Sequence, residues 1–158
     1  MQLGLVHLHN LLRWVILILL ITAIVKTYIG SKKNNGVLLS VDKKIGLFTL
    51  ISSHITLLIG IYQLLLGRFG ILVTTLPAGE SFMKNRFFRF YWMEHPLLTI
   101  LAVVCITAAY SQLKKNKPDV QKYAVAFKLY LVALALLLLA IPWPFRADIG
   151  RAILPGMH

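Results

Sequence analysis

The chain consists of four long apolar runs separated by short, charged connections. The clearest run extends from Ile45 to Gly67, between Lys44 and Arg68, and its 23 residues carry no formal charge. A helix needs about 20 residues to cross the hydrocarbon core of a bilayer. The pattern therefore predicts that residues 44–67 form a membrane-spanning helix.

The other three runs are long enough to cross as well. The first carries Arg13 inside it and Lys26 at its far end, where a long side chain can reach the interface. The last ends at a Pro-Trp-Pro sequence, which stops a helix. The predicted helices cover about residues 3–28, 44–67, 87–113 and 122–143. The expected fold class is all-α, a polytopic membrane protein with a four-transmembrane-helix bundle.

Composition supports this prediction and excludes an ordinary soluble domain. Hydrophobic residues make up 58% of the chain, and the mean hydropathy is +0.76, whereas soluble domains are about 45–50% apolar. The runs use nearly all of the chain, so we expect one membrane domain, residues 1–158, with a C-terminal tail at 146–158 on the outer surface. Because the first residues lack a basic leader and a small-residue cleavage site, we expect no signal peptide.

The net charge of +12 does not indicate nucleic-acid binding, because the charges stand at the ends of apolar runs rather than along a polar face. The single cysteine, Cys105, lies in an apolar run and excludes an intrachain disulfide or a cysteine-based metal site. No nucleotide-binding or hydrolase motif is present.

The lysines predict the orientation of the bundle, because cytoplasmic loops are enriched in basic residues. The first and third connections, with their flanks, hold Lys32, Lys33, Lys43, Lys44, Lys114, Lys115, Lys117 and Lys122. Both connections are then cytoplasmic, and both termini face the periplasm of a bacterial inner membrane. All six arginines but only one lysine, Lys84, fall on the outer half. Those arginines either meet lipid phosphates or bind an anionic ligand near the outer face.

Histidines are the main candidates for chemistry, since ionisable residues inside a membrane are costly and often functional. His7 and His9 open the first predicted helix, His54 lies near the middle of the second, and His95 lies in the third. A lone membrane histidine more often bonds a neighbouring helix. Three helices that carry histidine favour axial coordination of a b-type haem, which needs two imidazoles and an apolar slot.

The position of each histidine along its predicted helix, measured from the lysine at the cytoplasmic end, indicates which histidines can share one iron. At a rise of about 1.5 Å per residue, His9 lies roughly 26 Å above Lys26, and His95 lies roughly 28 Å above Lys114. His54 lies only roughly 15 Å above Lys44. His9 and His95 are therefore the first predicted pair of metal ligands, and His54 is an alternate partner or a second site. His54 could also donate a hydrogen bond to a neighbouring helix or contact a quinone.

Two charged residues complete the predicted site. Arg13 lies one turn beyond His9 on the same helix face, where it could meet a haem propionate or Glu94, or anchor the helix at the interface. His7 is about 200° around the helix from His9, so at most one of the two faces the interior. Glu94, the only acid within the predicted helices, could serve a quinone or a proton path beside His95, or pair with Arg13.

Four short segments carry a resemblance to a known group of proteins. They are HLHNLLRW (7–14), SSHITLLIG (52–60), EHPLL (94–98) and IPWPFR (141–146). In these segments the chain resembles small bacterial inner-membrane proteins labelled cytochrome B. The resemblance implies a b-type haem held by membrane histidines, with His9, His54 and His95 at the histidine positions, and a part in electron transfer. Larger four-helix families bind two haems through four histidines, but the fourth run here has none.

The predicted function is that of a small membrane b-type cytochrome, or a haem-bearing subunit, that transfers electrons with quinol and a membrane or periplasmic protein partner. Its cofactor would be haem b, with quinone as a second small molecule. The alternative is a cofactor-free accessory subunit of a larger inner-membrane complex, in which the histidines only join helices.

Overall fold

The computed structural model describes residues 2–33, 37–76, 79 and 81–151, and all regular secondary structure within these residues is helical, with no strand. The helices are α1 (Gln2–Lys32), α2 (Ser40–Leu66), α3 (Arg86–Arg89), the π-helical turn η1 (Phe90–Glu94), α4 (His95–Lys114) and α5 (Asp119–Ala140). Because α3, η1 and α4 follow one another without a break, the described residues contain four helices long and apolar enough to span a membrane. This confirms the predicted fold class.

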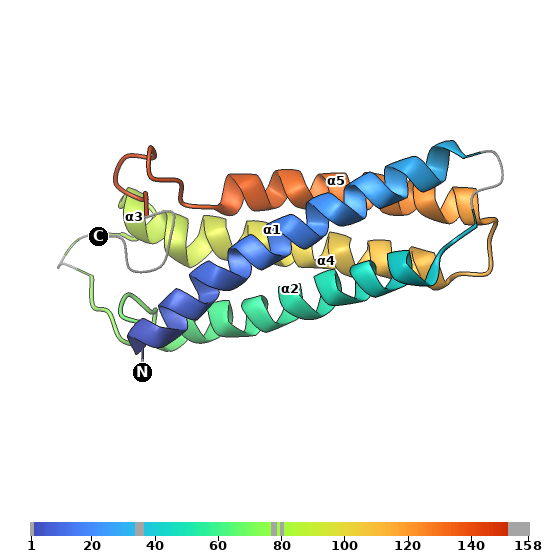
Figure 1. Cartoon of the computed structure of the whole chain (residues 1–158). Coiled ribbons are helices and arrows are strands. Elements are labelled where there is room, and N and C mark those ends of the chain that lie inside the picture. The colour runs from blue at the N-terminus through green and yellow to red at the C-terminus, as the bar shows by residue number, and fades with distance from the viewer. Residues whose placement is uncertain (1, 34–36, 77–78, 80, 152–158) are drawn as a thin grey trace.

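The four spanning helices lie side by side in one elongated bundle (Figure 1). Helix α1 packs on α2 and α5, and α4 packs on the same two helices, so α1 and α4 are diagonal neighbours across the bundle axis. We name the two ends by their charges. The arginine end holds the start of α1, the end of α2, α3 and the end of α5; the lysine end holds the opposite helix ends.

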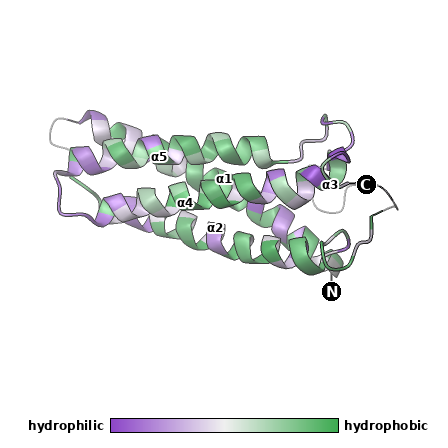
Figure 2. Cartoon of the chain, turned by 180° about the vertical axis from the view of Figure 1, so that it is seen from behind, coloured by the Kyte–Doolittle hydropathy of each residue, from purple (hydrophilic) through white to green (hydrophobic). Residues whose placement is uncertain are grey.

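The surface of the bundle is apolar along the helices and polar at both ends (Figure 2). Large hydrophobic side chains are widely exposed there, for example Ile18 at 64%, Leu58 at 67% and Leu139 at 62%. A soluble monomer does not present such a continuous apolar surface to water. The chain is therefore a multi-pass membrane protein whose outer faces contact lipid.

Small residues allow the helices to pack closely toward the lysine end. Ala109, Ala126 and Ala133 are fully buried in the hydrophobic core, around the rings of Tyr123 and Tyr130. Small interface residues are typical of membrane helices, because van der Waals packing rather than burial from water holds these helices together.

The lysine end is joined by polar contacts to the connection between α1 and α2. The Tyr123 hydroxyl hydrogen-bonds the buried carboxylate of Asp42 and accepts a hydrogen bond from the Leu39 N–H. The Asp119 carboxylate, at the start of α5, accepts the Leu38 N–H at 3.0 Å and pairs with Lys122. These bonds anchor the connection to α5.

The third spanning helix contains a π-helical turn before Pro96. Proline lacks an N–H, and its ring collides with the carbonyl four residues earlier. In η1 the His95 N–H bonds the Phe90 carbonyl, five residues back, which gives the chain the wider turn that this proline needs. The turn fixes the direction in which His95 leaves the helix.

The fourth spanning helix is displaced from its predicted bounds of 122–143. It begins at Asp119, after Pro118, and ends at Ala140, because Ile141 precedes Pro142 and a residue before proline avoids helical geometry. The predicted tail is folded over the arginine end as far as the structure describes it: Ile149 is buried, and its carbonyl accepts the Tyr91 hydroxyl at 2.7 Å. The rest of that tail, 152–158 with His158, lies outside the described residues.

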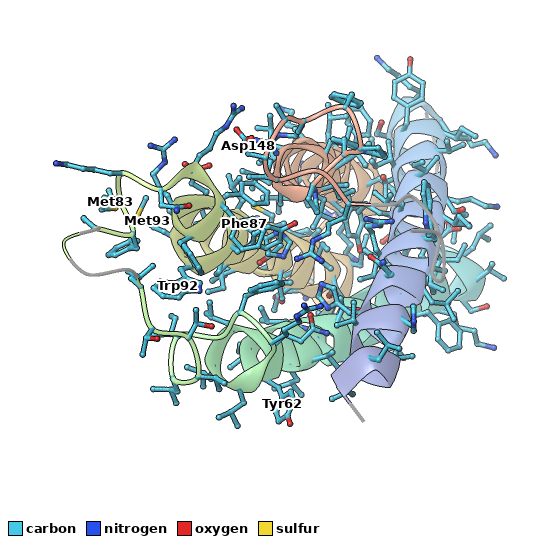
Figure 3. All side chains as sticks on the ribbon, turned by 90° about the vertical axis from the view of Figure 1, so that its left-hand side faces the viewer. Tyr62, Met83, Phe87, Trp92, Met93 and Asp148 are labelled. Carbon is cyan, nitrogen blue, oxygen red and sulfur yellow. The ribbon has the colours of Figure 1, made fainter. Side chains whose placement is uncertain are left out.

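Figure 3 looks onto the arginine end. Phe87 points inward, and its ring packs against those of Phe69 and Tyr91, at centroid distances of 5.2 and 4.7 Å. Tyr62 and Met83 point outward. Beneath this aromatic layer lie the polar side chains of the candidate site.

Candidate functional site

The structure brings the rings of His9 and His95 together across the bundle axis. Their centroids are 6.3 Å apart, with an angle of 62° between the ring planes. His9 comes from α1 and His95 from α4, which are diagonal helices with few contacts of their own. The two histidines that depth along the sequence placed at one level are therefore also turned toward each other.

His95 is oriented by the end of α5. The last four carbonyls of a helix have no partner within the helix. If α5 continued, residues 142 and 144 would donate to two of these carbonyls, but both residues are proline and have no N–H. Side chains replace those donors: Trp143 Nε1 bonds the Leu138 carbonyl at 2.9 Å, and Arg146 Nη1 bonds the Leu139 carbonyl at 3.0 Å. The Ala140 carbonyl accepts from His95 Nδ1 at 2.7 Å.

This hydrogen bond fixes the chemistry of the His95 ring. A carbonyl can only accept, so Nδ1 carries the proton, and in the neutral ring Nε2 keeps its lone pair. Histidines that bind metals commonly donate their second N–H to a carbonyl in the same manner. The Ala140 carbonyl, a backbone group that the sequence alone does not indicate, thus leaves Nε2 of His95 free to bind a ligand.

His9 packs against α2 at a glycine. A Cβ added at Gly60 would lie 3.3 Å from His9 Cε1, closer than most real contacts, so any larger residue would displace the ring. The Thr56 backbone also lies close to the ring. Nevertheless, His9 Nδ1 is buried and has no hydrogen-bond partner of ordinary geometry among the described residues. A buried polar atom of this kind is open to a ligand or a water molecule.

Arg13 lies within electrostatic range of the two histidines. It interacts electrostatically with His9, His95 and Tyr91. Side chains in a helix point toward the N-terminus of the helix. Because the N-terminus of α1 lies at the arginine end, the guanidinium of Arg13 extends toward that end. Tyr91 was not among the predicted site residues; it precedes His95 by one turn and lies 6.4 Å from it, ring centroid to ring centroid.

Glu94 lies at the edge of this group and has a partner of its own. Its carboxylate accepts Arg89 Nε at 2.9 Å, and the side chains of both residues are more than one-third exposed. The sequence suggested a pair with Arg13 instead. Arg89 is the nearer candidate along the chain, five residues before Glu94, and η1 brings the two side chains to the same side.

His54 is not brought to the histidine pair. Its ring is exposed on the surface of α2, and Nδ1 bonds the Leu50 carbonyl of the same helix at 2.9 Å. The interior face of α2 carries Gly46, Thr49, Ser53 and Thr56, and His54 is turned about 100° from Ser53. Among the described residues, no third His, Cys, Asp or Glu forms a metal-binding group with His9 and His95.

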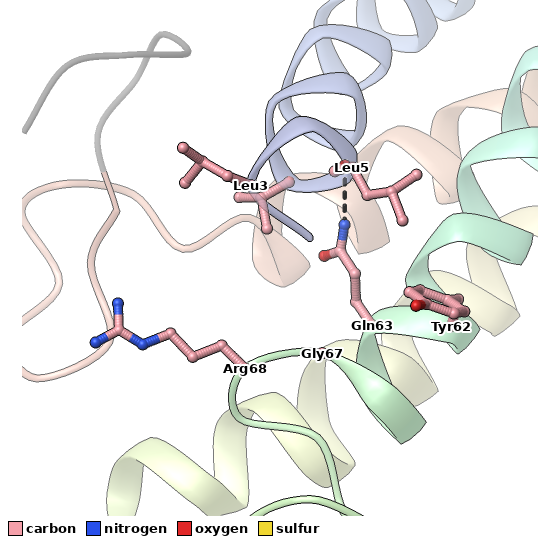
Figure 4. A pocket seen from close by; sticks show the side chains of 7 residues that line it. Leu3, Leu5, Tyr62, Gln63, Gly67 and Arg68 are labelled. Atoms are coloured by element: carbon pink, nitrogen blue, oxygen red, sulfur yellow. Dashed lines mark hydrogen bonds between the residues drawn. The ribbon is translucent and has the colours of Figure 1, made fainter. Parts of the chain in front are cut away.

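A groove opens between α1 and α2 at the arginine end (Figure 4). On α1 it is lined by residues that precede His9 by about one turn or more. Its volume is about 260 Å³, and its lining is mostly apolar, with Leu3, Leu5, Val6, Tyr62, Gln63, Gly67 and Arg68 around it. Gln63 Nε2 crosses from α2 to the Leu5 carbonyl at 3.0 Å and forms the floor between the helices.

Comparison with known proteins adds no relative: no family model, curated protein or solved structure matches this chain.

Proposed function

We propose that this protein is a small membrane b-type cytochrome, or a haem-bearing subunit of a membrane complex, in which His9 and His95 would hold the iron of one haem. The observation that carries the proposal is the convergence of the two rings across the bundle axis, 6.3 Å apart. When bound, the haem would supply an iron that accepts and donates single electrons.

The residues present fit such a group. The 6.3 Å between the ring centroids would allow both imidazoles to reach one metal ion, since a bond between a metal and a histidine nitrogen is about 2 Å long. His9 Nδ1 is a buried nitrogen without a hydrogen-bond partner among the described residues. His95 already carries the second-shell hydrogen bond, to the Ala140 carbonyl.

The neighbouring residues would orient and tune the site. Gly60 leaves room for the His9 ring, and the end of α5 locks the His95 ring through the Ala140 carbonyl. Arg13 supplies a positive charge beside both rings, which favours a propionate and the reduced state of a metal centre. The apolar helices around the pair keep water away.

We place the arginine end at the periplasmic side of a bacterial inner membrane, because the opposite end carries the lysines. The groove between α1 and α2 would then admit quinol from the membrane, with Tyr62 and Gln63 as its polar groups. A Gln63→Leu variant should raise the KM for quinol while the amount of bound haem stays unchanged.

Visible absorption spectra and haem analysis of the purified protein test the proposal. After expression with ample haem, the wild type should show the sharp α band of reduced b-type haem, at one haem per chain. His9→Ala and His95→Ala should lose this low-spin α band, whereas the matched control His54→Ala should keep it, because His54 faces outward. If the folded wild type shows no α band, the proposal fails, and the histidines act as contacts between helices in an accessory subunit.

A further inference from the structure

Three arginines from different parts of the chain surround one tyrosine hydroxyl at the arginine end. Arg151 Nε donates to the Tyr91 hydroxyl at 3.0 Å. Arg146 and Arg13 also interact electrostatically with Tyr91. Arg13 comes from α1, whereas Arg146 and Arg151 belong to the segment that folds back after α5. The fold thus concentrates positive charge around Tyr91.

None of the acids among the described residues pairs with Arg146 or Arg151. At the arginine end, Glu94 pairs with Arg89 at 2.9 Å, and Asp148 lies 3.6 Å from Arg86. Neither Arg146 nor Arg151 has an ion pair with an acid among the described residues. Like charges held together repel one another, and an anion between them removes that cost.

Asp42 and Asp119 cannot supply that anion, because both lie at the lysine end.

The two guanidiniums of Arg146 and Arg151 are fixed in place and retain donors. Arg146 lies over the Phe90 ring at 4.7 Å and uses only Nη1 in its bonds to the Leu139 and Ile141 carbonyls. Arg151 lies over the Tyr91 ring at 5.2 Å and uses only Nε. Within the described residues, their other nitrogens have no hydrogen-bond acceptor. Arginines stacked on aromatic rings are preorganised for a planar or tetrahedral anion.

We propose that the guanidiniums of Arg146 and Arg151 form a binding site for a phosphate group, with the Tyr91 hydroxyl holding Arg151 in place. Phosphate suits the site because its several oxygens can accept from two guanidiniums at once. The site lies at the membrane interface, where a phosphate is carried by a lipid headgroup or arrives free from solution. This binding requires no haem and is separate from electron transfer at the histidines.

Thermal unfolding of the purified protein in detergent tests the proposal and separates the two sources of phosphate. One arm titrates inorganic phosphate against chloride at equal ionic strength. The other adds phosphatidylglycerol or, as a neutral-headgroup control, phosphatidylcholine. A ligand that binds only the folded protein raises the Tm as its concentration grows. A rise with inorganic phosphate assigns a free-anion site, whereas a rise with phosphatidylglycerol alone assigns a lipid site.

The decisive variant is Arg151→Gln, because the Arg151 side chain bonds Tyr91 and makes no hydrogen bond to the end of α5. The Arg146 side chain, in contrast, bonds the Leu139 carbonyl of α5. Loss of one charged hydrogen-bonding group should weaken the apparent affinity about tenfold or more. Arg151→Lys should restore part of it. Lys84→Gln is the matched control, since it removes one exposed positive charge from the same end.

The proposal is overturned if neither ligand raises the Tm of the wild type above its chloride or phosphatidylcholine control. It is also overturned if Lys84→Gln weakens binding as much as Arg151→Gln, because general surface charge would then explain the effect.

Discussion

The close contact between Gly30 of α1 and the ring of Tyr123 gives a sharp test of how the bundle is packed. A Cβ added at Gly30 would lie 2.5 Å from Tyr123 Cδ2 and 2.6 Å from two further ring atoms. Real Cβ atoms do not come this close to other atoms, so something must move. The ring is 1% exposed and its hydroxyl is bound to Asp42, so it cannot simply swing into open space.

Two opposing effects determine the outcome of Gly30→Ala. Alanine favours a helix over glycine by about 1 kcal/mol. Overpacking of a filled interior costs about 1–3 kcal/mol, and a displaced ring also weakens the Tyr123–Asp42 hydrogen bond, worth about 1.5–3 kcal/mol when one partner is charged. The steric effect is larger, so the free energy of unfolding should fall by about 2 kcal/mol or more.

Unfolding by SDS in mixed micelles measures this change, with Gly4→Ala as the control on the same helix. No atom lies within 4 Å of the Cβ position at Gly4, so that variant should be as stable as the wild type or slightly more stable. If Gly30→Ala is as stable as Gly4→Ala, then α1 and α5 do not meet at this glycine and the described packing is wrong.

Two further predictions concern the lysine end and the orientation in the membrane. Tyr123→Phe should lower the free energy of unfolding by about 1–3 kcal/mol, because it leaves the buried Asp42 carboxylate without the Tyr123 hydroxyl. The control Tyr28→Phe, at a half-exposed ring, should change the free energy of unfolding little. Equal losses in the two variants would argue against the buried hydrogen bond. In a Cys105→Ala background, Lys33→Cys should react with an impermeant thiol reagent only from the cytoplasmic side and Lys84→Cys only from the periplasmic side. Labelling of Lys33→Cys from outside intact cells would reverse the proposed orientation.

The helices could be predicted from sequence because one physical requirement, the length of an apolar run, decides their existence. Their ends were harder to place. Helix α5 stops at Ala140 rather than 143, since the residue before Pro142 already leaves helical geometry. The π-helical turn in the third span could not be predicted, because the way a helix accommodates proline depends on its neighbours as well as on the proline itself.

The level shared by His9 and His95 could be predicted because the helical rise is fixed. The helix that each histidine ring faces could not be predicted, since the neighbours of a helix depend on the order of the helices around the bundle. For that reason the Ala140 carbonyl, Gly60 and Tyr91 were missed. The outward direction of His54 could have been predicted from the sequence. Thr49, Ser53 and Thr56 recur at helical spacing and mark the interior face of α2, and His54 lies outside this face.

The central claim is that His9 and His95 hold one iron from opposite sides, and electron paramagnetic resonance of the oxidised protein tests it most directly. Two imidazole ligands should give a low-spin ferric signal, which His9→Gly should convert to a high-spin signal. Added imidazole, entering the space left by the missing ring, should restore the low-spin signal, and His54→Gly should leave it unchanged. A low-spin signal that survives His9→Gly, or that only His54→Gly abolishes, would contradict the assignment of His9 and His95.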